Sequence, residues 1–535
     1  MIDRDKFLDL VLYQVYPRSF YDSNGDGIGD LRGVMLKLDY LQELGVNAIW
    51  ISPCYKSPNY DNGYDISDYR DIASDFGTLE DWKLLVKEMH SRGMKLLMDL
   101  VVNHTSSEHF WFKEARKSRD NPYHDYYIWA DEPLNDWRSA FSGSAWEYNE
   151  PTKEYYLHSF AVQQPDLNWE NPKVRKEACD IVDFWASLGV DGFRCDVLDN
   201  ISKDFKENKK SNGPRLHEYI NLLFGRDESK HLFTIGECRS DEKSICDICG
   251  KDRGELTTVF QFDHIDIGRK NKYTPCDFSY NEVRDTLIKW QNFSATHELL
   301  YMLFTDNHDQ PYYLSRIGND KELRYESATA LATTFYMLKG IPLIYQGQEF
   351  GSVNSFYEDI GCYNDIETIN YFNEKVYSKP LDLLISEINY GSRDNTRRPL
   401  AWTNDESRIF GFSSARPWLE MPTRANEVNL QNDLASKKSI FNFYKNLFKI
   451  RKDNLAIRRG EFKDLTNGQS DCFIFERTIN NKSVIVVCNY KEQKQIKLPE
   501  SLNESNYSLI LANYNVNNSL FNEFKPFEVR IYKNK

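Results

Sequence analysis

The chain has 535 residues, of which 41% are hydrophobic and 28% charged, and its formal net charge is −14. Its length suggests two to four domains, and an acidic chain without a long basic run disfavours nucleic acid and anionic membranes as partners. We find no apolar run near 18 residues and no secretory signal at the start. We therefore expect no transmembrane helix and a cytoplasmic location.

Eight short apolar runs predict β-strands, and segments with helical periodicity lie between many of them. In the first such segment, apolar residues recur at helical spacing from Leu31 to Leu44, and Gly45 follows as a stop signal. A repeated strand-then-helix order predicts parallel strands covered by helices, and eight strands predict a (β/α)8 TIM barrel of the α/β class. The eight runs are 10–17, 47–53, 95–104, 189–197, 232–237, 257–262, 300–307 and 341–347.

Two regions interrupt this pattern. Residues 105–168 are rich in Trp, Tyr, Asn and Asp, and we interpret them as a subdomain inserted after the third strand. From residue 460 the chain reads as short alternating strands, and Phe527, Val529 and Ile531 alternate with polar neighbours as in a half-exposed antiparallel sheet. We therefore predict a barrel of residues 1–104 and 169–459, the insert 105–168, and a C-terminal β-sandwich domain of residues 460–535.

The loop DSNGDGIGDLRG, residues 22–33, resembles an EF-hand calcium loop in its ligand spacing. However, position 12 is Gly33 rather than the required glutamate, and a predicted strand rather than a helix precedes the loop. A structural cation site remains possible, with Ca²⁺ or Mg²⁺ as the ion, and a metal-free loop is the alternative. Its predicted ligands are the side chains of Asp22, Asn24, Asp26 and Asp30 and the backbone carbonyl of Ile28.

The ten cysteines are spread thinly, which together with the missing signal indicates reduced thiols. Cys246 and Cys249 form a Cys-x-x-Cys pair. A zinc site would need two more ligands, for which Cys238 and Cys276 are candidates; unremarkable thiols are the alternative.

Acidic side chains follow three predicted strands. Asp196 ends the fourth strand beside Arg194, Glu237 ends the fifth, and His308 and Asp309 follow the seventh. Reactive groups of a barrel lie at the C-terminal ends of its strands, so these side chains should converge on one rim. Two opposed carboxyl groups are what glycosidic bond cleavage requires. Spacing alone does not assign their roles or the stereochemical outcome.

Several ordered motifs resemble the conserved regions of the α-amylase family, glycoside hydrolase family 13. They are DLVVNHTS (99–106), QPDLN (164–168), GFRCDV (192–197), TIGE (234–237) and TDNHD (305–309). DNGYDISDY (61–69), NGPRLHEY (212–219), YQGQE (345–349) and RDNTRRP (393–399) narrow the resemblance to the branch of oligo-1,6-glucosidases, glucan 1,6-α-glucosidases and trehalose-6-phosphate hydrolases.

The resemblance implies roles for the acidic residues. Asp196 matches the nucleophile that forms a covalent glucosyl-enzyme, Glu237 the general acid/base, and Asp309 a third carboxylate that holds sugar hydroxyls. The reaction would then be retaining, with the carboxyl groups of Asp196 and Glu237 about 5–5.5 Å apart. We further expect the anionic nucleophile to raise the pKa of Glu237 and so keep it protonated.

The resemblance also implies a glucose pocket. Asp61 and Tyr64 match the groups at the non-reducing end, and Phe160 and Gln164 match a lid from the insert. His104, Arg194, His308 and Arg393 match partners of hydroxyl or carboxylate groups.

Two further residues bear on the neighbouring sugar. In this branch, a valine directly after the nucleophile, here Val197, goes with α-1,6 bonds, and a small or hydroxylated residue goes with α-1,4 bonds. Glu367 resembles a residue that grips the next sugar, although a surface acid is the alternative.

Two departures from the usual motifs leave the preference for that sugar open. Cys238 and Arg239 follow Glu237, and the later motif reads RDNTRRPLAW where the family commonly has RDNARTPMQW. Arg239 or Arg398 could favour a phosphorylated sugar.

We therefore expect an exo-acting retaining α-glucosidase that acts on short α-1,6-linked oligosaccharides, as a monomer with a structural calcium ion and no organic cofactor. The alternatives are a trehalose-6-phosphate hydrolase and a sucrose-active α-glucosidase or isomerase.

Overall fold

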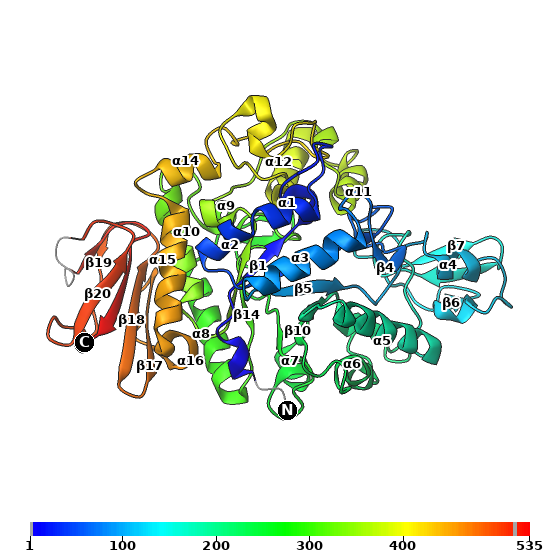
Figure 1. Ribbon diagram of the computed structural model, residues 1–535, viewed down its shortest axis with the longest axis horizontal. Helices are drawn as coiled ribbons and strands as arrows, with labels where there is room; N and C mark the ends of the chain where they lie inside the picture. Colours follow the sequence, from blue (N-terminus) through cyan, green and yellow to red (C-terminus); the bar gives the residue numbers. More distant parts are fainter. Residues whose placement is uncertain (1–3, 517–521) are drawn as a thin grey trace.

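The computed structural model describes residues 4–516 and 522–535. Its centre is an eight-stranded sheet in the order β11-β10-β9-β5-β2-β1-β15-β14, in which all neighbouring strands are parallel (Figure 1). A single bridge between Val259 and Tyr301 links the two outer strands, so the sheet is nearly closed as a barrel. All eight predicted strands are present: β1 (Leu12–Val15), β2 (Ala48–Ile51), β5 (Lys95–Leu100), β9 (Gly192–Cys195), β10 (Phe233–Gly236), β11 (Thr258–Val259), β14 (Met302–Leu303) and β15 (Ile341–Tyr345).

Helices cover the barrel, and local signals explain where they begin and end. Thr78 and Asp81 form a capping box at the start of α3 (Leu79–Ser91). The predicted first helix is divided at Lys37, whose backbone leaves the helical region, into α1 (Leu31–Leu36) and α2 (Leu38–Leu44). Gly45 ends α2 in the left-handed conformation, at φ 101°. Other covering helices are α5 (Pro172–Ser187), α6 (Leu216–Phe224), α7 (Glu242–Cys249), α8 (Tyr280–His297), α10 (Arg324–Tyr336) and α15 (Ile440–Asp453).

Residues 105–168 stand out at one end of the molecule, opposite the C-terminal strands (Figure 1). They contain α4 (Phe110–Ala115) and an antiparallel sheet of β6 (Trp129–Ala130), β7 (Trp146–Asn149) and β8 (Glu154–Leu157). A separate small core holds Trp137, Ala145, Trp146 and Leu157. The segment returns to the barrel through a bridge between His104 and Asp166, which places its last residues beside the end of β5.

The C-terminal strands form a five-stranded antiparallel sheet in the order β16-β17-β18-β22-β20. Their bounds are β16 (Glu461–Asp464), β17 (Cys472–Ile479), β18 (Lys482–Asn489), β20 (Tyr507–Ala512) and β22 (Val529–Asn534), and the pair β19 (Lys494–Gln495) and β21 (Glu523–Phe524) stands apart.

The half-exposed pattern expected at residues 527–531 is wrong. Glu528 and Arg530 are each only 2% exposed and pair with each other, and the ring of Phe524 in β21 lies 3.9 Å from the Arg530 guanidinium. One face of the sheet packs on the barrel core and the other contributes to a second hydrophobic cluster that includes Phe524 of β21. Side chains that alternate along β22 therefore point to two buried faces of the sheet, and neither face is exposed to solvent as expected.

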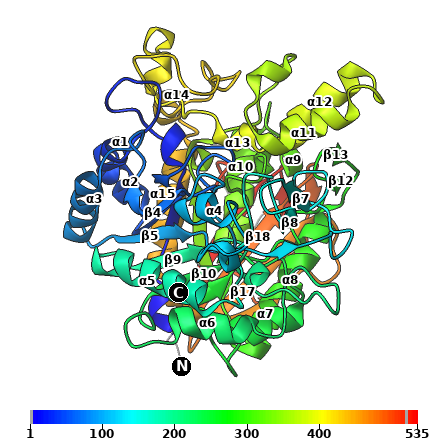
Figure 2. The same cartoon turned by 90° about the vertical axis from the view of Figure 1, so that its right-hand side faces the viewer.

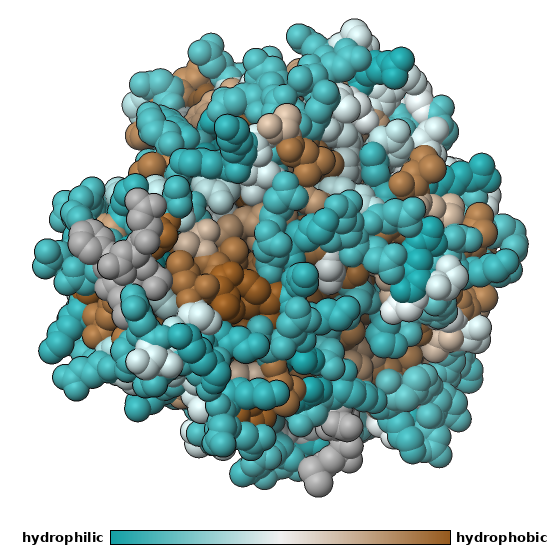
Figure 3. All heavy atoms as spheres, turned by 60° about the vertical axis from the view of Figure 1, so that its left-hand side comes forward, coloured by the Kyte–Doolittle hydropathy of each residue, from teal (hydrophilic) through white to brown (hydrophobic). Residues whose placement is uncertain are grey.

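Hydrophilic side chains cover most of the face shown in Figure 3, as the acidic composition leads one to expect. Within residues 4–516 and 522–535, no helix is both long and apolar enough to cross a membrane. The ten cysteines are free thiols.

Candidate active site

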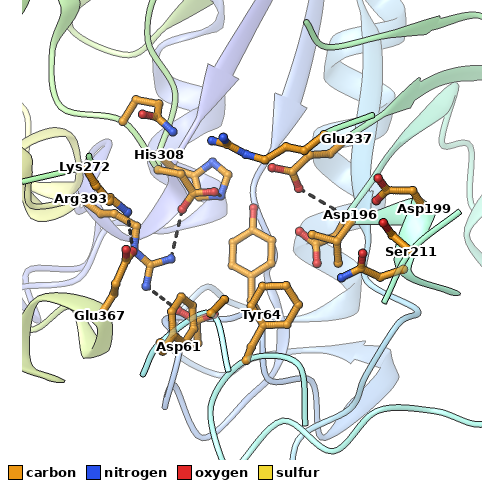
Figure 4. A pocket seen from close by; sticks show the side chains of 18 of the residues that line it. Asp61, Tyr64, Asp196, Asp199, Ser211, Glu237, Lys272, His308, Glu367 and Arg393 are labelled. Carbon is orange, nitrogen blue, oxygen red and sulfur yellow. Dashed lines mark hydrogen bonds and ion pairs between the residues drawn. The ribbon is translucent and has the colours of Figure 1, made fainter. Parts of the chain in front are cut away.

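A cavity of about 700 Å³ opens at the C-terminal ends of the barrel strands (Figure 4). Three further helices, α11 (Ile366–Lys375), α12 (Leu381–Gly391) and the short α13 (Asp394–Arg397), lie in the upper part of Figure 2. Of these, α11 contributes Glu367 to the lining, and Arg393 directly precedes α13. Eleven of the thirteen predicted catalytic and substrate-binding residues line it; only Gln164 and Arg194 lie behind its wall. The lining residues are Asp61, Tyr64, His104, Phe160, Asp196, Val197, Glu237, His308, Asp309, Glu367 and Arg393.

Arg194 organises one wall of this cavity. It lies in β9 with its side chain 1% exposed, and one terminal nitrogen is 2.7 Å from Asp196 Oδ1 and 2.9 Å from Asp99 Oδ1. Its other terminal nitrogen pairs with Glu237 Oε2. Asp196 and Glu237 directly follow the neighbouring strands β9 and β10, so parallel pairing brings both carboxyl groups to the same guanidinium.

These two carboxyl groups resist ionisation. Burial raises the pKa of Glu237 to about 7, against the opposing charge of Arg194, and the charge of Asp196 adds to the rise. Burial also raises the pKa of Asp196 to about 7. Because neighbouring carboxyls titrate as a pair, the first proton to leave makes the second harder to remove. The expected influence of Asp196 on Glu237 is present, but burial is the larger cause.

The opposite wall is rich in cations. Asp309 Oδ1 lies 2.9 Å from Arg397 Nη2 and 3.2 Å from Arg393 Nη1. Burial disfavours its charge, but nearby positive charges outweigh burial and hold the pKa of Asp309 well below its usual range. Asp365, which receives two hydrogen bonds from Arg393, behaves in the same way.

One end of the cavity is closed by a buried ion pair. Arg393 Nη2 lies 3.0 Å from Asp61 Oδ1, and Gln164 donates to the other oxygen of Asp61 at 3.1 Å. Phe160 lies 5.2 Å from the ring of His104 and 5.6 Å from the ring of Phe141 (centroid distances). The insert thus supplies the aromatic part of this end.

The floor carries a stacked ring pair. Tyr64 stacks on His308 at 5.0 Å with an interplanar angle of 6°, and the Tyr64 hydroxyl donates to Asp99 at 2.9 Å. His104 Nε2 is 3.0 Å from the carbonyl oxygen of Tyr64. Tyr64 therefore presents a rigid aromatic face to the cavity.

Val197 has an unusual backbone. Its φ of 34° and ψ of 48° are left-handed, which is rare and costly for a β-branched residue. In this conformation its N–H points at Glu237 Oε2, at 3.3 Å. The strained residue therefore links the two candidate catalytic carboxyls directly.

Glu367, at the first turn of α11, pairs with Lys272 and lies 3.4 Å from Arg393 Nε. It lines the cavity with its side chain 19% exposed, and its contact with a second sugar stays a prediction. The structure also separates the two arginines proposed for a phosphorylated sugar. Arg239 lines the cavity, whereas Arg398 is 1% exposed, stacks on Tyr357 and donates to backbone carbonyls away from it.

The sequence did not single out some residues of the site. Asp99 joins Trp50, Tyr64 and Arg194 beneath the floor, and its place in the DLVVNH motif was the available signal. Lys272 follows β12 (Arg269–Asn271), a strand of a short hairpin that no periodicity announces.

The loop at residues 22–33 has the hard oxygen donors that suit Ca²⁺, and none of its three aspartates forms an ion pair with a described Lys, Arg or His. However, the loop satisfies its own oxygens: Asp22 accepts from the N–H groups of Asn24, Gly25 and Gly27, and Asp30 caps α1 through Gly33. Over the described residues, no three His, Cys, Asp or Glu side chains are grouped to hold a metal ion. Calcium at the loop and zinc at Cys246 and Cys249 therefore stay predictions.

Comparison with known proteins identifies a family and several similar enzymes. Residues 14–460 match the alpha amylase catalytic domain family. The chain is 44% identical to the oligo-1,6-glucosidase of Parageobacillus thermoglucosidasius, over 99% of each chain. It superposes on a variant of Bacillus licheniformis trehalose-6-phosphate hydrolase with a TM-score of 0.93 at 37% identity, covering 99% of each chain. A variant isomaltulose synthase from Erwinia rhapontici NX5 gives a TM-score of 0.93 at 36% identity over 99% of each chain.

The family match covers most of the chain and includes the strands that carry Asp196, Glu237 and Asp309. The chain belongs to the α-amylase family, glycoside hydrolase family 13.

Proposed function

We propose that this glycoside hydrolase is a retaining, exo-acting α-glucosidase that releases glucose from the non-reducing end of short α-1,6-linked oligosaccharides. The observation that carries the proposal is the pair Asp196 and Glu237 on one guanidinium, within a cavity whose far end is closed. Asp196 would attack the anomeric carbon, and Glu237 would first protonate the leaving oxygen and then activate water. Full-length similarity to an oligo-1,6-glucosidase supports the linkage.

The closed end supports exo action. The ion pair of Asp61 with Arg393, backed by Gln164, stands at this end of the cavity, where a chain would have to continue beyond the first sugar. These groups pair with one another and have further hydrogen-bonding capacity for the hydroxyls of a terminal glucose, so a chain end is favoured over a chain interior.

The experiment is a substrate panel with wild-type enzyme: isomaltose, maltose, sucrose and trehalose 6-phosphate at equal concentration. The proposal expects isomaltose to have the highest kcat/KM and glucose to be the first product. Preference for any other panel member would overturn the linkage. Exo action is tested with isomaltotriose labelled at its reducing end: the first labelled product should be isomaltose, and labelled glucose would overturn exo action.

A second candidate is a hydrolase of a phosphorylated disaccharide. Arg239 and Lys270 line the cavity away from the closed end, and both are solvent-exposed; Arg239 has only a 4.0 Å contact to Asp266 as an ion pair. Two accessible cations where a second sugar would lie suit an anionic leaving group. Arg239→Ala would then reduce kcat/KM for trehalose 6-phosphate and leave isomaltose hydrolysis nearly unchanged.

A further inference from the structure

The ring of His308 is held on several sides. It is 1% exposed, it stacks on Tyr64, and the ring of Trp50 meets it edge-on at 5.8 Å. Its Nε2 lies 3.2 Å from Asp309 Oδ2, and its Nδ1 lies 2.9 Å from Gln14 Nε2. The ring cannot turn over without disturbing these neighbours, so its two nitrogens have fixed and different surroundings.

His308 carries a single proton. Burial lowers its pKa well below the usual range. Asp309 opposes this fall, while Arg194, Arg397 and Arg393 reinforce it. A neutral imidazole has one N–H donor and one acceptor nitrogen, so the position of that one proton decides what the ring offers to the cavity.

The contact with Gln14 shows which ring nitrogen of His308 carries the proton. Gln14 lies in the middle of β1, is fully buried, and directs its amide nitrogen at Ser52 Oγ and at His308 Nδ1, each at 2.9 Å. An amide nitrogen only donates, and its two hydrogens match these two acceptors. His308 Nδ1 is then an acceptor, and the ring proton is on Nε2.

The reversed arrangement is unfavourable. If the Gln14 carbonyl faced Nδ1, the proton would sit there, and the lone pair of Nε2 would face the Asp309 carboxylate at 3.2 Å. Asp309 stays negative because the guanidinium groups of Arg397 and Arg393 lie 2.9 and 3.2 Å from its Oδ1. Two electron-rich atoms at that distance repel each other, and the first arrangement avoids this contact. It leaves Gln14 Oε1 buried without a hydrogen-bond partner among the described residues, so the contact with Asp309 is the deciding difference.

We propose that Gln14 is a positioning residue that fixes neutral His308 with its proton on Nε2, so that an N–H faces the glucose site beside Asp309. This rests on the proposed function. Gln14 does not line the cavity and acts only through His308. A sugar hydroxyl arriving there would find a donor on His308 and an acceptor on Asp309, whereas the other tautomer would present two acceptors and no donor.

The test compares Gln14→Met, which removes the donor, with Gln14→Glu, which replaces it by an acceptor. With the best substrate of the wild-type panel, we expect kcat/KM to fall about tenfold for Gln14→Met, the scale of one hydrogen bond, and at least about a hundredfold for Gln14→Glu. The carboxylate introduced by Gln14→Glu would also favour a second proton on His308, so that variant should gain a new pH dependence that Gln14→Met lacks. Ser52→Ala, which removes only the other acceptor, is the matched control and should stay within about threefold.

Two further readouts separate a positioning role from a structural one. Thermal unfolding shows whether a variant is merely destabilised, and calorimetric binding of a glucose-like iminosugar measures the pocket without turnover. If the wild type cleaves no substrate of the panel, the proposed function is wrong. The role of Gln14 is then decided by the calorimetric affinity for the iminosugar alone. The inference is overturned if both Gln14 variants match Ser52→Ala in kcat/KM, iminosugar affinity and pH profile. If Gln14→Glu does not fold, Gln14→Met decides by the same comparison.

Discussion

The two walls of the cavity shift the pKa values of their carboxyl groups in opposite directions. On the wall formed by β9 and β10, three carboxyls, Asp99, Asp196 and Glu237, share the single guanidinium of Arg194, and all three pKa values are raised by burial. On the opposite wall, Asp309 has a lowered pKa although burial opposes its charge there too. There, the guanidinium groups of Arg397 and Arg393 lie 2.9 and 3.2 Å from Asp309 Oδ1, and Lys272 adds positive charge.

The difference shows that burial alone does not set the charge state, because positive charge around Asp309 outweighs it. The number of cations is not the only cause either, since burial raises the pKa of Asp61 although Arg393 lies 3.0 Å away. The wall of Asp196 and Glu237 has one guanidinium and retains a proton, which glycosidic cleavage needs at the leaving oxygen. The cations of the opposite wall keep Asp309 and Asp365 charged, which suits these carboxylates to hold hydroxyl groups and a transition state with positive character. Each variant proposed below as a test of catalysis changes a residue of one wall and leaves the other wall intact.

The largest effect should come from Asp196→Asn. Without an attacking carboxylate no glucosyl-enzyme can form, so kcat on isomaltose should fall by on the order of 10⁴-fold or more. Thermal unfolding should show that the variant is folded, because the amide keeps the shape of the buried side chain. Turnover within a factor of ten of wild type would remove Asp196 from the chemistry.

Glu237→Gln should remove the proton but leave the nucleophile. We expect kcat on isomaltose to fall roughly 10²- to 10⁴-fold, the range for general acid–base catalysis. An aryl α-glucoside with a good leaving group needs no protonation, so release of the first phenol should be affected far less. Equal losses on both substrates would contradict the role of acid.

The wild-type pH profile tests the same wall. Since the pKa of Glu237 is raised to about 7, its protonated form prevails below that pH and is lost above it. We expect kcat/KM to decline above about pH 7, approaching tenfold per pH unit. A rate that keeps rising to pH 9 would contradict a protonated Glu237 as the working form.

Arg393→Gln weakens the cation-rich wall. Loss of one guanidinium should raise the pKa of Asp309, so its charged form is lost as the pH falls. We expect a loss in kcat/KM on the order of a hundredfold at pH 7, from charge-assisted hydrogen bonds, and a larger loss at pH 5. Arg416→Gln, an exposed arginine, is the control. A ratio to wild type that does not change with pH would show that Arg393 does not control the charge of Asp309.

Much of this site could be predicted because its residues directly follow strands. Asp196 and Glu237 end apolar runs that are evident in the sequence. Because β9 and β10 pair in parallel, their ends bring the two carboxyl groups together. The family resemblance added the distant partners, such as Arg393, that no local pattern connects. Lys272 was not predicted as a site residue because it follows a hairpin strand of three residues, which is too short to show a periodic pattern.

Burial was harder to predict than topology. Arg239 and Arg398 look alike in sequence, yet one is open to the cavity and the other is enclosed by Tyr357 and backbone carbonyls. Likewise, Glu528 and Arg530 suggested an exposed face and are buried, because Phe524 of β21 packs on that face. Such differences depend on what packs from elsewhere in the chain, which local patterns do not contain.

Val197→Thr should have a smaller effect, on linkage rather than rate. The residue keeps β-branching and therefore the strained backbone, so only the polarity beside the scissile bond changes. We expect the ratio of kcat/KM for maltose to that for isomaltose to rise by about tenfold or less. An unchanged ratio would remove Val197 from the specificity argument.

The smallest effect should come from the loop at residues 22–33, which lines neither wall. If the loop binds Ca²⁺, treatment with a chelator should lower the unfolding temperature by about 2–4 °C, and Ca²⁺ should restore it. Asp26→Asn should abolish the response, and Mg²⁺ in place of Ca²⁺ distinguishes the two ions. Identical unfolding with and without Ca²⁺ would favour a loop held by its own hydrogen bonds.

The most direct measurement is the configuration of the first glucose released, followed by proton NMR before the anomers equilibrate. If Asp196 displaces the leaving group from the opposite face of the sugar, and water activated by Glu237 then displaces Asp196 from the face that the leaving group occupied, an aryl α-glucoside must yield α-glucose first. An aryl α-glucoside is the substrate because isomaltose also releases its reducing-end glucose, which is already a mixture of both anomers. Initial β-glucose would mean a single direct displacement by water, and the paired roles given to Asp196 and Glu237 would be wrong.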